Sequence, residues 1–520
     1  MLLERNLIAP LPPAEPPAAS TPSRARWIVL ALGGVLYLLA VHGQWDVPIA
    51  AWLAGVFLLR FTRASRPWAG FAVVAGVTAV GVAYYLFQAG MQVFGPMLLL
   101  CVPLGLGFVL PYLIDRLISP RLRRPLPRSL VFPLAIVAAE YVIATATPIG
   151  SALSSLAVTQ HENLPLLQLT AITGSYGVSF LVAWFASVVN QLWEHGLFDG
   201  GAGRPTKIVA LTFAGVLALV IIGGTARLAF FAPSAETARV AGVTWSKSIN
   251  DRADSELDRY ESMLEAAQTD PAVVRRSFAM INNDLLASTE REARAGAELV
   301  VWPEAGAAVL EADRAAFLEQ VGALAARTGS YVEVGLGVIT EAPPHSRNEA
   351  ILIDPTGAVL WTYQKAHPVP FLDSTIPGDG VVPKIATPLG RIANVICFDA
   401  DFPTLMRQPD VDLMLVPSND WLGFGQTHTE KITLRAIENG YSVVRQDSNG
   451  LSRIIDPQGR TLAQSDFFTT EQQTVVADVP ITGSRTIYGA IGDVFAWLCL
   501  AALAVLVAGG VIGRRRGVAG

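Results

Sequence analysis

The stretch Val395-Ile396-Cys397-Phe398-Asp399 places a thiol at the end of an apolar run, within a mixed segment that lies between long hydrophobic stretches. A short apolar run of this kind is typical of a buried strand, and the residue that follows such a strand emerges at the edge of the sheet. A thiolate there can carry acyl-thioester chemistry. We therefore expect Cys397 to be a nucleophile, and its hydrophobic setting suggests that a lipid supplies the acyl group.

The composition is that of a membrane protein with more than one structural unit. Of the 520 residues, 52% are hydrophobic and only 16% are charged, and a chain of this length exceeds what one core usually serves. The net charge is −5 and no basic face is evident, which argues against nucleic acid as a partner. The three cysteines have no paired spacing, so a disulfide framework is not expected.

Eight apolar stretches each approach the ~20 residues that a helix needs to cross the hydrocarbon layer. They lie at about 27–43, 47–60, 68–88, 91–114, 129–147, 174–194, 207–231 and 487–512. The pattern predicts an α-helical membrane bundle of about eight spans, with seven in residues 27–231 and one in 487–512. Residues 1–26, rich in Pro and Ala, are interpreted as a disordered cytoplasmic tail, and 513–520 as a basic cytoplasmic tail.

Positive charges gather in alternate loops. Basic residues occur at Arg60, Arg63 and Arg66, at Arg116, Arg121, Arg123, Arg124 and Arg128, at Arg204 and Lys207, and at Arg514, Arg515 and Arg516. The intervening loops near 44–46, 89–91 and 148–173 contain no Lys or Arg. The positive-inside rule therefore predicts that both termini are cytoplasmic and that residues 232–486 lie outside the membrane on the opposite face.

Two features of the membrane part point toward a site. Glu140 is an acidic residue deep in an apolar stretch, where an ionisable group is costly unless it is paired or faces a cavity. A functional role and a helix-to-helix hydrogen bond are both open for it. The outer loop 148–173 is long and apolar, so we expect it to form one wall of a lipid-accessible cleft.

Residues 232–486 alternate short β-rich runs with helical ones, which predicts an α/β layered domain with ligands at strand ends. Strands are expected at 240–245, 298–303, 331–339, 348–353, 391–397, 412–417, 442–447 and 451–456, and helices at 271–296, 311–328 and 427–439. Three strand ends carry Glu304, Lys365 and Cys397. A thiol needs a base, and a tetrahedral oxyanion needs a positive charge or N–H donors, so these residue types together fit nucleophilic acyl transfer.

These residues resemble the nitrilase, or carbon-nitrogen hydrolase, superfamily. Three pieces of the chain look like the three motif regions of that superfamily: Trp302-Pro303-Glu304, the run from Tyr363 to Phe371, and Ile396-Cys397-Phe398-Asp399. The run from Ser418 to Trp421 and the helix from His428 to Asn439 also resemble that superfamily. With the membrane stretches 166–169 and 174–181, the resemblance narrows to the membrane-embedded apolipoprotein N-acyltransferases and covers nearly the whole chain from about residue 27. It implies an αββα sandwich domain over 232–486 and a Glu-Lys-Cys catalytic triad.

The resemblance further implies the reaction and the partners. Glu304 would take the thiol proton, the Cys397 thiolate would attack a phospholipid acyl ester, and Lys365 would hold the oxyanion. The α-amino group of a lipoprotein's diacylglyceryl-cysteine would then resolve the thioester. The implied partners are a membrane phospholipid and a diacylated apolipoprotein, without metal or other cofactor, in a monomer whose catalytic domain lies on the periplasmic side of the bacterial inner membrane.

Some positions depart from the pattern of that family. Asp373 stands where the family usually has a Glu after the catalytic Lys, and we expect the shorter carboxylate still to hydrogen-bond Lys365. Phe398 and Asp399 replace a Tyr and a Glu, and Ile149 replaces an aromatic residue near Pro148. These changes concern substrate positioning, so they bear on the acceptor more than on the thioester step.

Other side chains have two interpretations each. Trp421 and Phe424, in a Gly-rich turn, fit either a mobile lid over the acyl chain or an interfacial membrane anchor. His367 and His428 have no metal-ligand spacing with Cys or carboxylate pairs, which favours a structural or hydrogen-bonding role. Arg445 could contact a lipid head group or serve inside the fold.

Three functions remain open at this point. The first is the N-acyltransferase, acting on lipoproteins or on a different amine. The second is a membrane-tethered nitrilase-type amidase or hydrolase, in which water resolves the thioester. The third is a catalytically silent scaffold or transporter. A lipid-facing, water-excluding approach to Cys397 would favour the first, and the scarcity of intramembrane charges beyond Glu140 disfavours transport.

Overall fold

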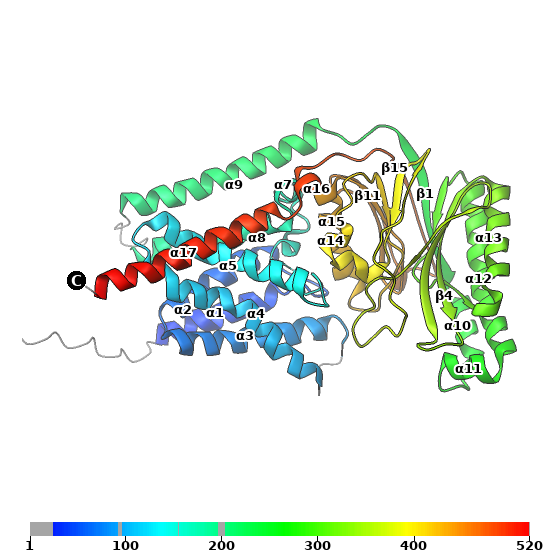
Figure 1. The fold of residues 1–520 in the computed structure, drawn as a ribbon, viewed down its shortest axis with the longest axis horizontal. Helices are drawn as coiled ribbons and strands as arrows, with labels where there is room; N and C mark the ends of the chain where they lie inside the picture. Colours follow the sequence, from blue (N-terminus) through cyan, green and yellow to red (C-terminus); the bar gives the residue numbers. More distant parts are fainter. Residues whose placement is uncertain (1–23, 92–95, 154, 196–202, 519–520) are drawn as a thin grey trace, which may run out of the picture.

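The computed structural model describes residues 24–91, 96–153, 155–195 and 203–518, and it shows a helical bundle at one end of the molecule and an α/β domain at the other (Figure 1). The predicted disordered tail, apart from its last residues, lies outside this described part of the chain. The first described helix already begins at Arg24.

Seven helices longer than 15 residues precede the α/β domain and one follows it within the described residues. They are α1 (Arg24–Leu39), α2 (Pro48–Arg63), α3 (Pro67–Gln88), α4 (Pro96–Ile118), α5 (Pro125–Ala146), α8 (Ser175–Glu194), α9 (Arg204–Phe230) and α17 (Val494–Val518). Several begin with Pro in the first turn, where the fixed φ of proline suits a helix start and its missing N–H costs nothing. By length and composition, α3, α5, α8, α9 and the α17 segment Val494–Ile512 could cross a membrane. The other three predicted spans correspond to α1, α2 and α4.

Two connections differ from the sequence prediction. The outer loop is broken into η2 (Val158–Gln160), α6 (Leu164–Leu167) and α7 (Thr170–Thr173). The single helix expected at 487–512 is two, α16 (Ile487–Ile491) and α17, because Gly492 adopts a φ of 65°, a left-handed conformation that ends a helix. The prediction treated 487–512 as one apolar stretch and passed over Gly492-Asp493, where the break falls.

The α/β domain contains two large sheets. The order in the first is β15 (Gln472–Pro480), β1 (Thr237–Ser246), β2 (Leu299–Val301), β4 (Tyr331–Ile339), β5 (Ser346–Ile353) and β6 (Val359–Gln364), with β3 (Ala307–Leu310) beside β4. The order in the second is β14 (Thr461–Asp466), β13 (Leu451–Ile455), β11 (Ser442–Arg445), β9 (Leu413–Leu415), β8 (Gly390–Asn394) and β7 (Lys384–Thr387). A small sheet pairs β10 (Ser418–Asn419) with β12 (Asp447–Ser448). The strands β3, β7, β10, β14 and β15 were not predicted, and β6 was implied only by the placement of Lys365 at a strand end.

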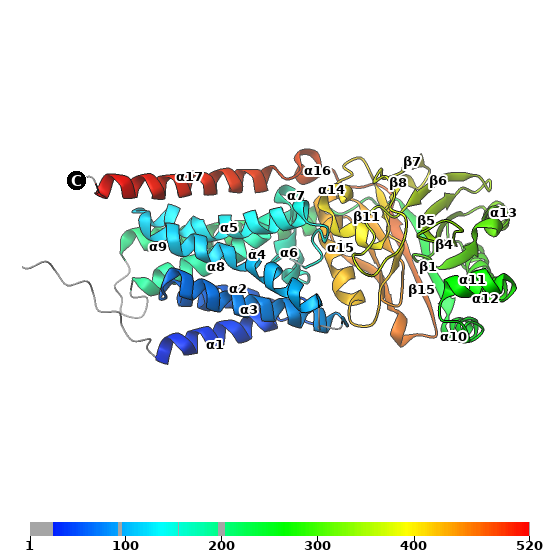
Figure 2. The same ribbon diagram turned by 60° about the horizontal axis from the view of Figure 1, so that its bottom comes forward.

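The two sheets pack face to face and helices cover their outer faces, which confirms the layered α/β domain (Figure 2). Leu299 and Leu352 of the first sheet share one apolar core with Leu413 and Val444 of the second. The first sheet is covered by α12 (Pro271–Arg294) and α13 (Arg314–Thr328), with α10 (Lys247–Ser255) and α11 (Met263–Thr269) beside them. The second is covered by α14 (Pro403–Met406) and α15 (Gly425–Asn439), which face the helical bundle (Figure 1).

Hydrogen bonds join the bundle to the α/β domain. Ser151 N donates to the Asp401 carbonyl oxygen at 2.7 Å, and Ser175 N donates to Glu438 Oε1 at 2.7 Å. The Gln168 amide donates to the Gln458 carbonyl oxygen at 3.0 Å. The outer loop and the start of α8 thus hold α15 and the second sheet against the helical bundle. Cys397 follows β8 on this side of the second sheet.

Candidate active site

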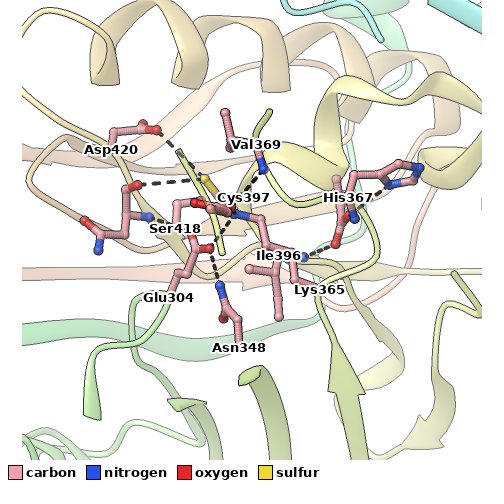
Figure 3. A network of polar contacts seen from close by, with 12 residues as sticks. Glu304, Asn348, Lys365, His367, Val369, Ile396, Cys397, Ser418 and Asp420 are labelled. Atoms are coloured by element: carbon pink, nitrogen blue, oxygen red, sulfur yellow. Dashed lines mark hydrogen bonds and ion pairs between the residues drawn. The ribbon is translucent and has the colours of Figure 1, made fainter. Parts of the chain in front are cut away.

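The three side chains predicted to form a triad meet between the two sheets (Figure 3). Glu304 follows β2 in the first sheet, Lys365 follows β6, and Cys397 follows β8 in the second sheet. All three line one cavity. Because β2 and β8 belong to different sheets, the sandwich itself brings the carboxylate and the thiol together.

Cys397 sits on a strained turn at the end of the second sheet. Its φ of 46° lies in the left-handed region, which is unfavourable for a residue with a Cβ. The strand β8 ends at Asn394, three residues before the thiol, so the predicted strand 391–397 was too long. The Cys397 N–H donates to the Pro417 carbonyl oxygen at 2.9 Å, and this bond ties the turn to the end of β9. Such a turn lifts the thiol out of the sheet and into the cavity.

The environment of Cys397 favours the protonated thiol at rest. The residue is 3% exposed. Burial raises the pKa of the thiol, and the Glu304 carboxylate raises it further, while the Lys365 ammonium only partly offsets these effects. The thiol therefore ionises little by loss of its proton to water, and this proton must pass to a base when substrate is bound.

A pH-dependent alkylation experiment tests this state of Cys397. Because its pKa is raised, the thiolate fraction is small at pH 7 and grows about tenfold per pH unit below the pKa. We expect labelling of Cys397 by iodoacetamide to accelerate steadily from pH 6 to 9, as measured by peptide mass spectrometry. Cys397→Ala gives the background from the other cysteines. Labelling that is already pH-independent at neutral pH would contradict the raised pKa.

Glu304 is held by three donors from three different segments. Its Oε1 accepts hydrogen bonds from Lys365 Nζ at 2.7 Å and from Asn348 Nδ2 at 2.5 Å, and its Oε2 accepts from the Asn419 N–H at 3.1 Å. These contacts fix the carboxylate in one orientation beside the thiol (Figure 3). A fixed carboxylate next to a buried thiol is placed to act as a general base.

Lys365 is buried and bridges two carboxylates. Its Nζ lies 2.7 Å from Glu304 and 2.6 Å from Asp373 Oδ2. Burial alone would lower the pKa of Lys365, but the charges of Glu304 and Asp373 outweigh it and raise the pKa. The ammonium group is therefore a fixed positive charge in the cavity, which suits the stabilisation of an oxyanion. The expected contact of Asp373 with Lys365 is present in spite of its shorter side chain.

Replacing Asp373 with asparagine should slow acylation of the enzyme. Asp373 also accepts a hydrogen bond from the Val369 N–H at 2.9 Å, which an asparagine oxygen can still accept. The loss is then the charge-assisted bond to Lys365, worth ~1.5–3 kcal/mol, or roughly 10–100-fold in rate if it persists in the transition state. Single-turnover kinetics of acyl-enzyme formation measure the effect. Asp373→Glu, which keeps the charge, should retain most of the rate, and equal losses in both variants would contradict this role.

A second charged network lies on the other side of the thiol. Asp420 Oδ1 is 3.9 Å from Cys397 Sγ, and its Oδ2 accepts from Arg445 Nη2 at 2.7 Å. Arg445 also reaches Asp447 at 3.1 Å, and His428 Nδ1 lies 2.8 Å from Asp420 Oδ1. Burial raises the pKa of Asp420, but the charges of Arg445 and His428 lower it well below its usual range. Arg445 is completely buried, so its role is inside the fold and not at a lipid head group.

The histidines near the site differ in their surroundings. His367 Nδ1 lies 3.0 Å from Asp399 Oδ1 and its ring stacks on Phe402, which agrees with the expected hydrogen-bonding role. The ligand atoms of Cys397, Asp420 and His428 lie within 4.8 Å of one another, a juxtaposition that the sequence spacing did not predict. Arg445 already compensates the Asp420 charge from within hydrogen-bond distance, which makes a cation at this point unfavourable.

A cavity of about 290 Å³ leads from the thiol toward the bundle. Besides the triad, it is lined by Tyr85, Leu86, Met91 and Leu104 of the bundle, by Ile149, Ala152 and Leu153 of the outer loop, and by Phe371, Phe398, Trp421 and Phe424 of the α/β domain. Most of these side chains are apolar, so the wall suits a hydrocarbon chain. The outer loop contributes one wall, as expected from its composition.

Trp421 and Phe424 lie at the mouth of this cavity. Their rings stack with centroids 4.6 Å apart, and the Trp421 indole N–H donates to the Ala89 carbonyl oxygen at the end of α3. Phe424 is buried, which disfavours an interfacial anchor for it. The pair instead closes the gap between bundle and α/β domain.

Glu140 lies apart from the Cys397 cavity. Its Oε1 accepts a hydrogen bond from the Leu156 N–H at 2.9 Å, and the residue lines a neighbouring cavity within the bundle. This hydrogen bond fixes the outer loop on α5. Glu140 therefore acts on the Cys397 cavity indirectly, through the outer loop. This bond joins a helix to a loop and is not the helix-to-helix hydrogen bond that was considered, and the functional role of Glu140 stays a prediction.

The sequence did not single out Asn348, and it left the role of Arg445 open. Asn348, at the start of β5, donates to Glu304, and Arg445, at the end of β11, compensates Asp420. An asparagine or arginine at a strand end is common, and only the three-dimensional pairing distinguishes these two. Glu304, Lys365 and Cys397 were detectable because their types match one reaction.

Comparisons with known proteins agree with this architecture. A family described as Carbon-nitrogen hydrolase matches residues 262–487, and one described as Apolipoprotein N-acyltransferase N-terminal domain matches residues 33–188. An apolipoprotein N-acyltransferase of Geobacter metallireducens is 26% identical over 93% of this chain and 95% of its own length. Those of Bradyrhizobium diazoefficiens and Haemophilus influenzae are 28% and 25% identical over 67% and 63% of this chain and 67% and 64% of their own lengths.

Among solved structures, an amidase from Nesterenkonia sp. aligns with a TM-score of 0.37 at 18% identity, covering 48% of this chain and 93% of the amidase. The two family matches fall on the two parts of the molecule, the helical bundle and the α/β sandwich. A relative aligned along almost the whole chain joins these parts in the same order. The chain therefore belongs to the apolipoprotein N-acyltransferase family, within the carbon-nitrogen hydrolase superfamily.

Proposed function

We propose that this enzyme transfers an acyl chain from a membrane phospholipid to the α-amino group of the diacylglyceryl-cysteine at the N-terminus of an apolipoprotein. The observation that carries the proposal is the apolar cavity that joins the bundle to the buried thiol of Cys397. An acyl chain can enter it from the bilayer, while water is largely excluded from the thioester.

The first half-reaction acylates Cys397. The thiol proton passes to Glu304 as the sulfur attacks the ester carbonyl carbon, and Lys365 stabilises the negative charge on the carbonyl oxygen. The C–O bond of the ester then breaks, and Glu304 returns the proton to the departing glycerol oxygen. The products are a lysophospholipid and a thioester on Cys397.

The second half-reaction releases the acyl chain to an amine. Glu304 accepts a proton from the attacking α-amino group, the N–C bond forms, and the C–S bond breaks to give an amide. Glu304 then returns this proton to the Cys397 sulfur. Trp421 and Phe424 move aside to exchange lysophospholipid for lipoprotein, which makes the turn between β10 and α15 a lid. Substrate positioning involves three further residues of the cavity lining, Phe398, Asp373 and Ile149.

We further propose the placement of this monomeric enzyme in the bacterial inner membrane, with residues 27–231 and 487–512 forming about eight spans. The ends of α2 and α4 and the starts of α5 and α9 lie at the end of the bundle away from the α/β domain, together with the C-terminal end of α17 (Figures 1 and 2). These are the positions of the clustered Arg and Lys residues. The asymmetry supports cytoplasmic tails at 1–26 and 513–520 and a periplasmic catalytic domain at 232–486.

The function is tested with the purified full-length protein, a diacylated lipopeptide and a phospholipid whose acyl chains carry a heavy isotope. We expect mass spectrometry to show one labelled acyl chain on the peptide α-amine, and an equal amount of labelled lysophospholipid. A peptide with a blocked α-amine is the matched control and should stay unchanged. Labelled free fatty acid with an unmodified peptide would overturn the proposal in favour of a hydrolase or a different acceptor.

A further inference from the structure

Two histidines and two carboxylates meet at the contact between the bundle and α15, outside the cavity of Cys397. His42 and Asp46 lie in the connection between α1 and α2, His161 follows η2, and Glu430 lies on α15. His42 Nδ1 is 2.7 Å from Asp46 Oδ2, and His42 Nε2 is 3.3 Å from Glu430 Oε2. His161 Nε2 is 3.7 Å from Asp46 Oδ1, and its Nδ1 is 3.6 Å from Glu430 Oε1. Each imidazole thus faces one carboxylate with each of its nitrogens.

The cluster is almost sealed from solvent. The side chains of His42, Asp46 and Glu430 are 2%, 3% and 6% exposed, and that of His161 is 13% exposed. His42 Nε2 is buried and has no hydrogen-bond partner in the described part of the chain, although it faces the Glu430 carboxylate. A buried ring nitrogen without a partner calls for a ligand or proton that completes its environment.

The charges of the cluster are unbalanced with neutral imidazoles. Within the described residues, the ion pairs of Asp46 and Glu430 are with these two histidines and with no Lys or Arg. Two buried carboxylates at low dielectric are costly, and the single Arg453 charge acts on Glu430 only from beyond ion-pair distance. A cation between Asp46 and the two histidines would compensate the remaining negative charge.

The ligand set fits a transition-metal ion. Imidazole nitrogen and carboxylate oxygen are the donors that zinc prefers besides thiolate, at ~2.0–2.2 Å, so that ligand atoms around one tetrahedral ion lie ~3.3 Å apart. Ligand atoms of His42, Asp46 and His161 lie within 4.8 Å of one another. Glu430 faces the remaining ring nitrogens, and Gln426 Nε2 holds its Oε1 at 3.0 Å. A carboxylate that accepts the second N–H of a ligating histidine is the usual support of such a site.

We propose that His42, Asp46 and His161 bind one divalent transition-metal ion of the zinc class, with Glu430 orienting both imidazoles. The expectation of no metal came from the resemblance to the acyltransferases and, for His367 and His428, from their spacing in the sequence. This site draws its ligands from two loops that the fold brings together. The ion fastens the connection between α1 and α2 to the outer loop, and Glu430 joins both to α15. The site thereby fixes the helix that carries His428 against the bundle. The proposal is independent of the acyl-transfer reaction.

The test uses the full-length protein in detergent, purified through an affinity tag without histidine and stripped with a chelator. After incubation with ZnCl₂ and removal of free metal, elemental analysis should find about one zinc per chain. His42→Ala and His161→Ala should each weaken zinc binding by more than 10-fold, and Glu430→Gln by ~10–100-fold, as for other residues that orient a ligating histidine. His345→Ala, on a distant loop, and Cys397→Ala should bind zinc like the unmodified protein.

Two further readouts keep the proposal testable if a variant fails to fold. Zinc should raise the melting temperature of the unmodified protein, because an ion that binds only the folded state stabilises it. Co²⁺ in its place should give the visible bands of a nitrogen- and oxygen-ligated ion without the near-ultraviolet thiolate band that binding at Cys397 would produce. Unmodified protein that retains no zinc and shows no thermal shift would overturn the proposal and leave an ion-pair network. Full zinc retention in the His42→Ala, His161→Ala double variant would overturn it as well.

Discussion

Replacing Cys397 with alanine is expected to reduce acyl transfer by at least ~10³-fold, because the thioester has no other nucleophile in the described site. In the unmodified protein, intact-protein mass spectrometry after incubation with phospholipid alone should detect one added acyl chain. The variant should show none. Without lipopeptide the acyl-enzyme has no amine to attack it, so the adduct accumulates and is easiest to observe.

The matched control for this loss is Cys499→Ala. Cys499 lies on α17, packs against Leu134 and Val137 of α5, and does not line the cavity of Cys397. The control should keep both the adduct and the transfer activity. The thermal unfolding midpoints of the two variants should be similar to that of the unmodified protein, which separates lost chemistry from lost folding. An acyl adduct that persists in Cys397→Ala would place the nucleophile elsewhere.

The convergence of Glu304, Lys365 and Cys397 could be predicted because each follows a strand and the three residue types together fit one reaction. Glu304, Lys365 and Cys397 lie at the ends of β2, β6 and β8, where the edge of a sheet presents side chains to a ligand. The layered α/β class was predictable for the same reason, since strand and helix periodicities alternate along 232–486. The edge strand β14 was missed because Thr461-Leu462-Ala463-Gln464-Ser465-Asp466 is largely polar.

Contacts between segments that lie far apart in the sequence could not be predicted. His42 and Glu430 are separated by about three quarters of the chain, and nothing in either neighbourhood indicates that they lie 3.3 Å apart. Asn348 and Arg445 are similar cases, because their importance depends on the carboxylates that they meet. A pairing of this kind depends on how two folded units dock, and hydrophobic periodicity reports only which face of one element is buried.

Replacing Arg445 with methionine is expected to destabilise the folded protein by ~3–5 kcal/mol, the usual cost of removing one partner from a buried ion pair. Arg445 is completely buried and donates to both Asp420 and Asp447. The methionine fills much of the space but removes the arginine charge from Asp420 and Asp447. Thermal unfolding of the detergent-solubilised protein, followed by tryptophan fluorescence, measures the loss.

Two companion variants separate charge from packing. Arg453→Met on the neighbouring strand β13 removes an arginine whose Nε donates to Gln464 at 3.1 Å near the surface, and it should cost less than ~1 kcal/mol. Adding Asp420→Asn to Arg445→Met removes the carboxylate whose pKa Arg445 lowers, and it should recover part of the stability. If the double variant is as unstable as the single one, the effect of Arg445 lies in packing and not in charge.

The pH dependence of the stability lost in Arg445→Met tests the electrostatic effect. The Arg445 and His428 charges lower the pKa of Asp420 below its usual value of about 3.9 against the opposing effect of burial. A carboxyl group with a lowered pKa contributes stability above its unfolded pKa, and this contribution is lost as the pH falls through the folded pKa. Without Arg445, the buried Asp420 carboxyl group takes up its proton at a higher pH. The stability difference between the unmodified protein and Arg445→Met should therefore be largest near neutral pH and shrink below about pH 4, and a difference that grows on acidification would contradict the paired carboxylate.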